Sequence, residues 1–293
     1  MSDRLFLSYP NRVDPATTVT GGSWLTTHPA SNTQQLQITK LARSTNILPA
    51  STLMNFALQS YDSYNIRVVA LANHNLINGA MWRISLGTTV GGTDLYTSGW
   101  ITVNPAGIVY LPSYMIDDPD LGTNYDAIHV IPEGVGFCSH VTVEIDCIDA
   151  TGCIGGTHVQ IGRVFIGNLW QPEFNADYGL QDGVNDLSTS QMSPSGVSWQ
   201  VARRKVKTVA FNLSLLTQLK ANYLADLYTH AGTVDEMMYL PGDPTATSES
   251  GEEVTTAADV QRYGFIGRLA ALGDIGYPSY NRRATQIKLE ALT

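Results

Sequence analysis

Val141-Thr142-Val143-Glu144-Ile145-Asp146-Cys147 is the stretch that decides the fold class. Apolar and polar residues alternate at every position, which is the period-2 pattern of a β-strand with one buried face. We therefore expect the side chains of Val141, Val143, Ile145 and Cys147 to face one hydrophobic interior.

Strand patterns recur on both sides of this stretch. Trp82, Ile84 and Leu86 alternate with polar residues, and residues 66–72 form a β-rich run that suits burial on both faces. Residues 159–167 follow a glycine-rich turn, so we expect them to pair with 141–147 as a hairpin. Strands spaced roughly 8–15 residues apart, with turns between them, favour a β-sandwich or jelly roll.

The sequence predicts a mainly β protein of two domains. We expect residues 1–170 to form a jelly-roll β-sandwich. A polar, Gly- and Ser-rich segment begins at residue 171 and marks the domain boundary. We expect residues 171–293 to form a smaller β-rich domain. A leucine stripe predicts one amphipathic helix at about 215–231, for which Ser214 and Thr217 are both plausible N-caps.

The net charge and the cysteine content indicate which binding partners and which cell compartment to expect. The chain has 17 basic and 26 acidic residues, a net charge of −9, so we expect neither nucleic-acid nor membrane binding. The one basic cluster, Arg203-Arg204-Lys205 with Lys207, fits either a local anionic contact or a charged strand start. Three cysteines, Cys138, Cys147 and Cys153, fit buried thiols of a protein made in a reducing compartment.

Catalytic motifs are not found in the sequence. It has no nucleophile elbow, no phosphate-binding Gly-rich loop with lysine and no paired-histidine metal motif. The six histidines are scattered, and Asn73-His74-Asn75 lacks the surroundings of a nuclease site, so we expect its amides to tie a local turn. We expect no enzyme and no cofactor.

An acidic loop is the best ligand candidate in the sequence. Asp117, Asp118, Asp120 and Asp126 place hard oxygen ligands close together, as Ca²⁺ requires. Their spacing is not that of an EF-hand, since no glutamate follows at the twelfth position. A weak calcium site and a solvated turn held by proline and glycine therefore both remain open, and we favour the turn.

Several segments, in a fixed order, resemble a family of bacteriophage tail proteins. The segments are Leu41-Ala42-Arg43-Ser44-Thr45, Val68-Val69-Ala70-Leu71-Ala72-Asn73-His74-Asn75-Leu76, Ala80-Met81-Trp82-Arg83-Ile84, Ser98-Gly99-Trp100, Ile161-Gly162-Arg163-Val164-Phe165-Ile166-Gly167, and Trp199 with Arg203-Arg204. The resemblance runs through most of residues 35–230. It implies a tail-tip or baseplate structural protein (distal-tail-like) of a long-tailed phage, with a galactose-binding, discoidin-like jelly-roll half.

The resemblance also implies partners and a location. It implies a cyclic homo-oligomer, a hexamer, that joins the tail tube to the host-recognition apparatus and contacts other tail proteins in the virion. The alternative function is a carbohydrate-binding module that recognises a host surface glycan, because the jelly-roll half belongs to a fold that often binds sugars.

Overall fold

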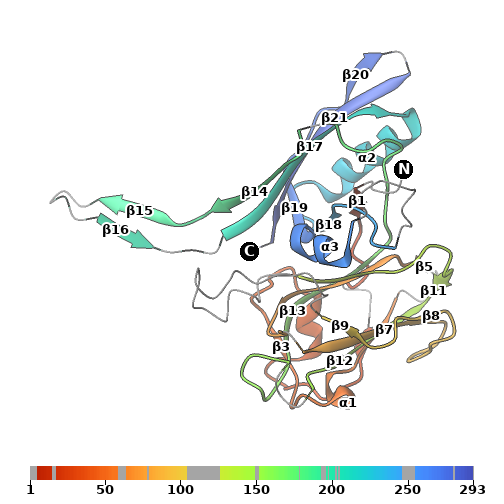
Figure 1. The fold of residues 1–293 in the computed structure, drawn as a ribbon, viewed down its shortest axis with the longest axis vertical. Coiled ribbons are helices and arrows are strands. Elements are labelled where there is room, and N and C mark those ends of the chain that lie inside the picture. The colour runs from red at the N-terminus through yellow and green to blue at the C-terminus, as the bar shows by residue number, and fades with distance from the viewer. Residues whose placement is uncertain are drawn as a thin grey trace. The chain divides into compact units, whose positions relative to one another are not determined.

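The fold is given by a computed structural model, which describes residues 5–292 except 15–17, 59–63, 78, 104–125, 149–151, 178, 193–195, 197, 202, 204, 246–254 and 280. The chain divides into two compact units (Figure 1). The first unit contains residues 1–171 and 240–264, and the second contains residues 172–239 and 265–293. Both units are built mainly of antiparallel strands, so the prediction of a mainly β protein is confirmed.

The first unit contains a sheet with strand order β2-β4-β12-β7-β8, in which β9 also pairs with β7. A second sheet has the order β10-β6-β13-β3. The strands of the first sheet are β2 Thr18–Thr20, β4 Met54–Ala57, β12 His140–Asp146, β7 Met81–Gly87, β8 Tyr96–Thr97 and β9 Ile101–Thr102. Those of the second are β10 Ala127–Val130, β6 Val68–His74, β13 Gln160–Gly167 and β3 Ala42–Arg43.

Both sheets contribute side chains to one hydrophobic core. On β12, Val141, Val143 and Ile145 are fully buried, as is Cys147 just after its end, so the predicted interior face is confirmed. Trp82 of β7 lies in the same core as residues of β6 and β13. The alternation in β12 therefore has the physical cause that the sequence suggests, which is one face against the core and one against polar surroundings.

The predicted hairpin between residues 141–147 and 159–167 is wrong. Strand β12 pairs with β4 and β7, whereas β13 pairs with β6 and β3 in the other sheet. The chain crosses from one sheet to the other between these strands. Both strands bury apolar side chains in the same core, so their patterns are compatible with either arrangement, and pattern alone does not identify the hydrogen-bonding partner.

Smaller elements of the first unit lie outside the two sheets. They are β1 Phe6–Ser8, the 3-10 helix η1 Ala30–Gln34, α1 Pro49–Thr52, the strand pair β5 Tyr64–Asn65 and β11 Phe137–Cys138, and α3 Ala257–Tyr263. We expected residues 240–264 in the C-terminal domain, but they belong to the first unit. Helix α3 was also not predicted. It begins with a capping box, in which the Thr256 hydroxyl accepts from the Asp259 N–H and the Asp259 carboxylate accepts from the Thr256 N–H.

A buried arginine joins two distant segments of the first unit. Arg163 of β13 is fully buried, donates to the Thr33 carbonyl at 3.2 Å and forms an ion pair with Asp14. The ion pair and the hydrogen bond offset the desolvation of a charge in the core. Arg163 therefore has a structural role.

The second unit is one antiparallel sheet with a helix. Its strand order is β18-β19-β21-β17-β14, and β20 pairs with β21. The strands are β18 Met237–Leu240, β19 Phe265–Ala271, β21 Arg282–Ala291, β17 Lys205–Leu216, β14 Gln181–Asp186 and β20 Gly276–Ser279. The helix is α2 Gln218–Ala231. Its N-cap is Thr217 rather than Ser214, because β17 continues to Leu216, so the helix begins three residues later than predicted.

The edges of the two sandwich sheets are joined by His129 of β10 and Tyr96 of β8. The Tyr96 hydroxyl lies 2.9 Å from His129 Nε2, and the two rings stack with centroids 6.2 Å apart. The ring of Trp82 meets His129 edge-on at 6.4 Å. Burial among these aromatic side chains lowers the pKa of His129 from 6.5 to about 4.

This histidine predicts a loss of stability in acid. Between pH 6.5 and about 4 the unfolded chain binds a proton at His129 that the folded chain does not, so the free energy of unfolding should fall as the pH drops through this range, by up to about 3 kcal/mol. Urea unfolding at several pH values measures the effect. In His129→Gln, which can still hydrogen-bond to Tyr96, the slope should be smaller by about one proton. Equal slopes in the two proteins would contradict the assignment.

Candidate interaction surfaces

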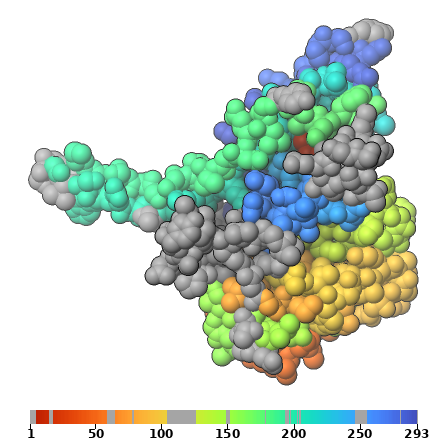
Figure 2. Space-filling model, viewed as in Figure 1, coloured from red at the N-terminus to blue at the C-terminus, as the bar shows by residue number. Residues whose placement is uncertain are grey.

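Two strands whose described residues are all exposed form an arm on the second unit. Strands β15 Thr189–Met192 and β16 Ser198–Val201 pair with each other and extend beyond the sheet that β14 and β17 belong to (Figures 1 and 2). Every described residue of β14, β15 and β16 is exposed. We call β15, β16 and the residues joining them to β14 and β17 the arm.

The arm carries large apolar side chains with no cover from its own chain. Trp199 is 65% exposed and Val201 55%, while Met192 is 76% exposed. The register pairs Gln191 with Trp199 and Thr189 with Val201, so both apolar residues of β16 lie on the same face of the ribbon. Trp199 and Val201 thus form a short exposed apolar strip on one face, with Met192 on the other face, which makes the arm a candidate interaction site.

The base of the arm holds the basic cluster that the sequence singled out. Arg203 and Lys205 are exposed where β17 begins, as a charged strand start requires. Lys205 lies opposite Asp186 on β14. Hydrogen bonds from Ser188, and in smaller part the charge of Lys205, hold the pKa of Asp186 below its usual value. The charge of Lys205 is therefore partly offset by Asp186 at the base of the arm, while Arg204 lies outside the described residues.

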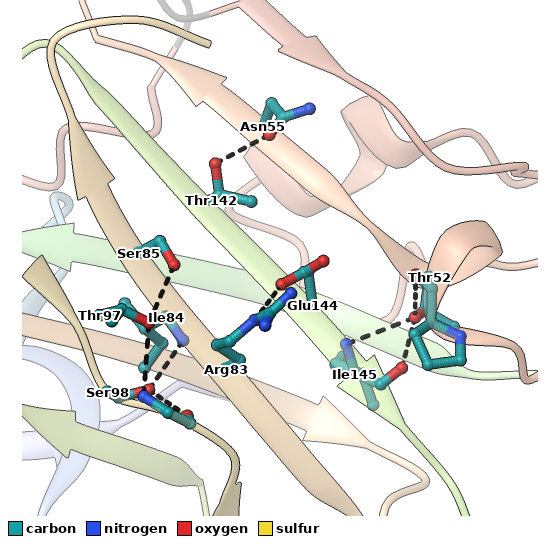
Figure 3. Close-up of polar contacts among 12 residues, drawn as sticks. Thr52, Asn55, Arg83, Ile84, Ser85, Thr97, Ser98, Thr142, Glu144 and Ile145 are labelled. Atoms are coloured by element: carbon teal, nitrogen blue, oxygen red, sulfur yellow. Dashed lines mark hydrogen bonds and ion pairs between the residues drawn. The ribbon is translucent and has the colours of Figure 1, made fainter. Parts of the chain in front are cut away.

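A second surface lies on the outer face of the β4-β12-β7 sheet (Figure 3). Polar side chains of these strands and of β8 form a row on this face, and three of them, Asn55, Ser85 and Thr142, are buried. Thr142 donates to the Asn55 side-chain oxygen at 2.8 Å, and Ser85 is 3.4 Å from the Thr97 hydroxyl. Glu144 forms an ion pair with Arg83 on the adjacent strand.

Trp100 completes this outer face. The Arg83 guanidinium lies 4.9 Å from the centroid of the Trp100 ring, and the tryptophan is 38% exposed. The hydrogen bond to Glu144 raises the pKa of Arg83, so the arginine stays charged. The face thus presents a partly exposed aromatic ring, a fixed cation and a fixed carboxylate side by side. Strand pairing brings Arg83 and Glu144 together although 61 positions separate them.

The predicted calcium site falls mostly outside the described residues. Asp117, Asp118 and Asp120 lie there, and only Asp126, just before β10, is described. Among the residues that the structure describes, no three His, Cys, Asp or Glu side chains are grouped so that they could hold a metal ion. The calcium hypothesis therefore remains a prediction.

We expected the Asn73-His74-Asn75 segment to be held by local turn bonds. Its asparagines instead bond to distant parts of the chain. Asn73 donates to the Ile38 carbonyl at 2.6 Å, and Asn75 donates to the carbonyls of Ile154 and His158. The Leu76 N–H donates to His74 Nδ1 at 3.2 Å, a local bond that the histidine ring makes rather than an amide. The asparagines therefore connect distant loops at one end of the sandwich.

In the described part of the chain, no helix is long and apolar enough to span a membrane.

The arm is the surface that the sequence interpretation missed. Residues 171–196 showed no strand period because neither face of β14 or β15 is buried, so selection for a core leaves no alternation there. The available signal was the Trp199-Gln200-Val201 alternation directly before the basic cluster.

Comparisons with known proteins give no family. No protein-family model matches the chain, and no curated protein matches it. Part of the chain is similar to a family 89 glycoside hydrolase from Clostridium perfringens solved in complex with PUGNAc, with 11% identity and a TM-score of 0.34 over 53% of this chain and 14% of that one. The module CpGH89CBM32-4 produced by Clostridium perfringens matches over 55% of this chain and 100% of its own length, with 14% identity and a TM-score of 0.31. With TM-scores this low, neither likeness supports a function for this chain.

Proposed function

We propose that this protein is a structural subunit that assembles with copies of itself through the arm. The observation that carries the proposal is the exposed apolar surface of the arm, with Trp199 and Val201 uncovered on one face and Met192 on the other. A two-stranded ribbon is marginally stable in water on its own. A contact that covers Trp199 removes apolar area from water and orders the ribbon at the same time.

A second copy of the chain is the partner we favour for the arm. In this proposal the arm lies on the body of a neighbouring copy rather than on its arm, so the contact joins two different surfaces. Contacts of this head-to-tail type generate closed rings when the rotation between copies closes. Trp199 is of a residue type that often dominates the binding energy of an interface.

The finer proposal is a tail-tip or baseplate subunit of a long-tailed phage, located in the virion. The sequence resemblance supports it, and Trp199 and Arg203 of that resemblance lie in the arm. The same resemblance supports a sixfold ring that joins the tail tube to the host-recognition apparatus. In this proposal the protein is not an enzyme, and its partners are copies of itself and other tail proteins.

The oligomeric state of the purified full-length protein tests the proposal. Light scattering after size exclusion and negative-stain electron microscopy should show a closed ring, with six copies as the expected number. A protein that stays monomeric at every concentration reached, and is absent from purified virions, would contradict it.

Saccharide binding by the outer sheet face is the second candidate function. The Trp100 ring, 38% exposed beside the Arg83–Glu144 pair, favours it. An exposed aromatic ring provides an apolar platform for the carbon face of a sugar, and a fixed cation and carboxylate can hydrogen-bond its hydroxyl groups. The ligand class would be a neutral host-surface glycan.

Substitution of Trp100 tests this second candidate. If the face binds glycans, Trp100→Ala should lower the affinity for any array hit at least about tenfold, because loss of a stacked aromatic costs about 1.4 kcal/mol or more. Phe137→Ala is the matched control, since Phe137 is also an exposed aromatic of the first unit, at 63%. An array without hits, or equal binding by both variants, would contradict saccharide binding at this face.

A further inference from the structure

Two of the three cysteines lie together at one end of the sandwich. Cys147 directly follows β12, and Cys153 forms an isolated β-bridge with Leu76. The Gly152 N–H donates to the Cys147 carbonyl at 2.8 Å, which brings the chain back beside its own strand end. The two thiols lie close enough to influence each other's ionisation, and both residues are buried, with 0% and 3% exposure.

The third cysteine is far from this pair. Cys138 lies in β11, before β12 begins, and pairs with β5. The seven residues of β12 separate it from Cys147, and a strand rises about 3.3 Å per residue, so the two are more than about 20 Å apart. Cys138 is therefore an internal control for chemistry that requires two adjacent sulfurs.

We propose that Cys147 and Cys153 are a modification site, at which the two thiols are oxidised to an intramolecular disulfide by a low-molecular-weight disulfide. Two thiols that the fold holds beside each other meet the first geometric requirement for this bond. The proposal is independent of the proposed assembly.

The reaction balances as two thiol–disulfide exchanges. One thiol loses its proton and attacks the oxidant, which forms a mixed disulfide and releases one small thiol. The second protein thiol loses its proton and attacks the protein sulfur of that mixed disulfide, which releases the second small thiol. The protein loses two hydrogens, and the oxidant gains them as two thiols.

Burial sets the expected rate. Desolvation, with a smaller contribution from Cys153, raises the pKa of the Cys147 thiol well above its usual value. The attacking thiolate is therefore scarce at neutral pH, so the disulfide should form slowly and the rate should rise with pH. The chain stays reduced in a reducing cytoplasm, and the bond closes during long exposure to an oxidising medium.

Oxidation of the folded, full-length protein by oxidised glutathione tests the site. After incubation the protein is unfolded, alkylated with N-ethylmaleimide and weighed by mass spectrometry. The wild type should change from three adducts to one, and Cys138→Ser from two adducts to none. Peptide mapping should give a Cys147–Cys153 link. The Tm should rise by several degrees and return after reduction, because the cross-link restricts the unfolded chain.

Two substitutions separate this result from non-specific oxidation. Cys147→Ser and Cys153→Ser should each form no internal link and show no rise in Tm under the same treatment. Three adducts on the wild type after the longest incubation, a glutathione adduct that never resolves, or a link through Cys138 would each overturn the proposal.

Discussion

Replacement of residues 187–204 by Asn-Gly should convert the protein from a ring to a monomer without unfolding it. Asp186 and Lys205 face each other in the β14–β17 ladder, so a two-residue type I′ turn can join them and leave the sheet intact. The replacement removes Trp199, Val201 and Met192 together. If two of these act as hot spots at about 2 kcal/mol each, self-association should weaken roughly a thousandfold, which analytical ultracentrifugation measures.

Two point variants serve as controls for the arm. Trp199→Ser keeps the arm at full length and should weaken assembly on its own, whereas Phe137→Ser, at an equally exposed aromatic of the first unit, should not. The Tm of the shortened protein should stay close to that of the parent. Rings of normal size formed by the shortened protein would show that the arm is not the interface between copies.

Val143→Asp should destabilise the first unit more than any surface change. Val143 lies on β12 between β4 and β7, is fully buried and belongs to the main core. A carboxylate there has no partner, so it must either lose its hydration or become protonated, at a cost of roughly 3–5 kcal/mol. Urea unfolding of the purified variant measures the loss, and expression without soluble protein is the extreme form of the same result.

A second variant at position 143 separates the cost of a buried charge from the cost of lost apolar packing. Val143→Ala removes two methyl groups and should cost about 2 kcal/mol through lost burial alone. Glu144→Gln, one residue away on the outer face, keeps the shape of the side chain and should cost less than Val143→Ala. A Val143→Asp protein that unfolds like the parent would show that this side chain does not face the core.

A sandwich of this kind does not define a function, because the same architecture carries many unrelated sites. The arm and the outer sheet face therefore lead to different experiments, and each can fail without the other. Loss of assembly after arm removal does not bear on glycan binding by Trp100. Both surfaces occur on one chain. A single subunit could therefore assemble through the arm of its second unit and bind glycans through the outer sheet face of its first unit.

Local sequence determined the strands and the helix that bury one face. In β12 and β7 the alternation of apolar and polar residues follows directly from a core on one side, so both strands and their inward residues could be predicted. Helix α2 was predicted from its leucine stripe, and its end at Gly232 fits the positive φ of 55° found there. These features depend on contacts or conformations that repeat within one segment.

Sheet partners, the arm and the membership of residues 240–264 were decided only by the tertiary structure. Strand β13 pairs with β6 rather than β12, a choice between two hydrogen-bonding partners that the pattern of either strand fits equally well. The pairing of Arg83 with Glu144 and the contact of Cys147 with Cys153 depend on how the chain returns to itself. The arm left no period because it buries neither face within its own chain. Apolar periodicity arises from burial within the folded chain, so it identifies a strand that packs against its own core. It does not identify which strand pairs with it or which surface binds a partner.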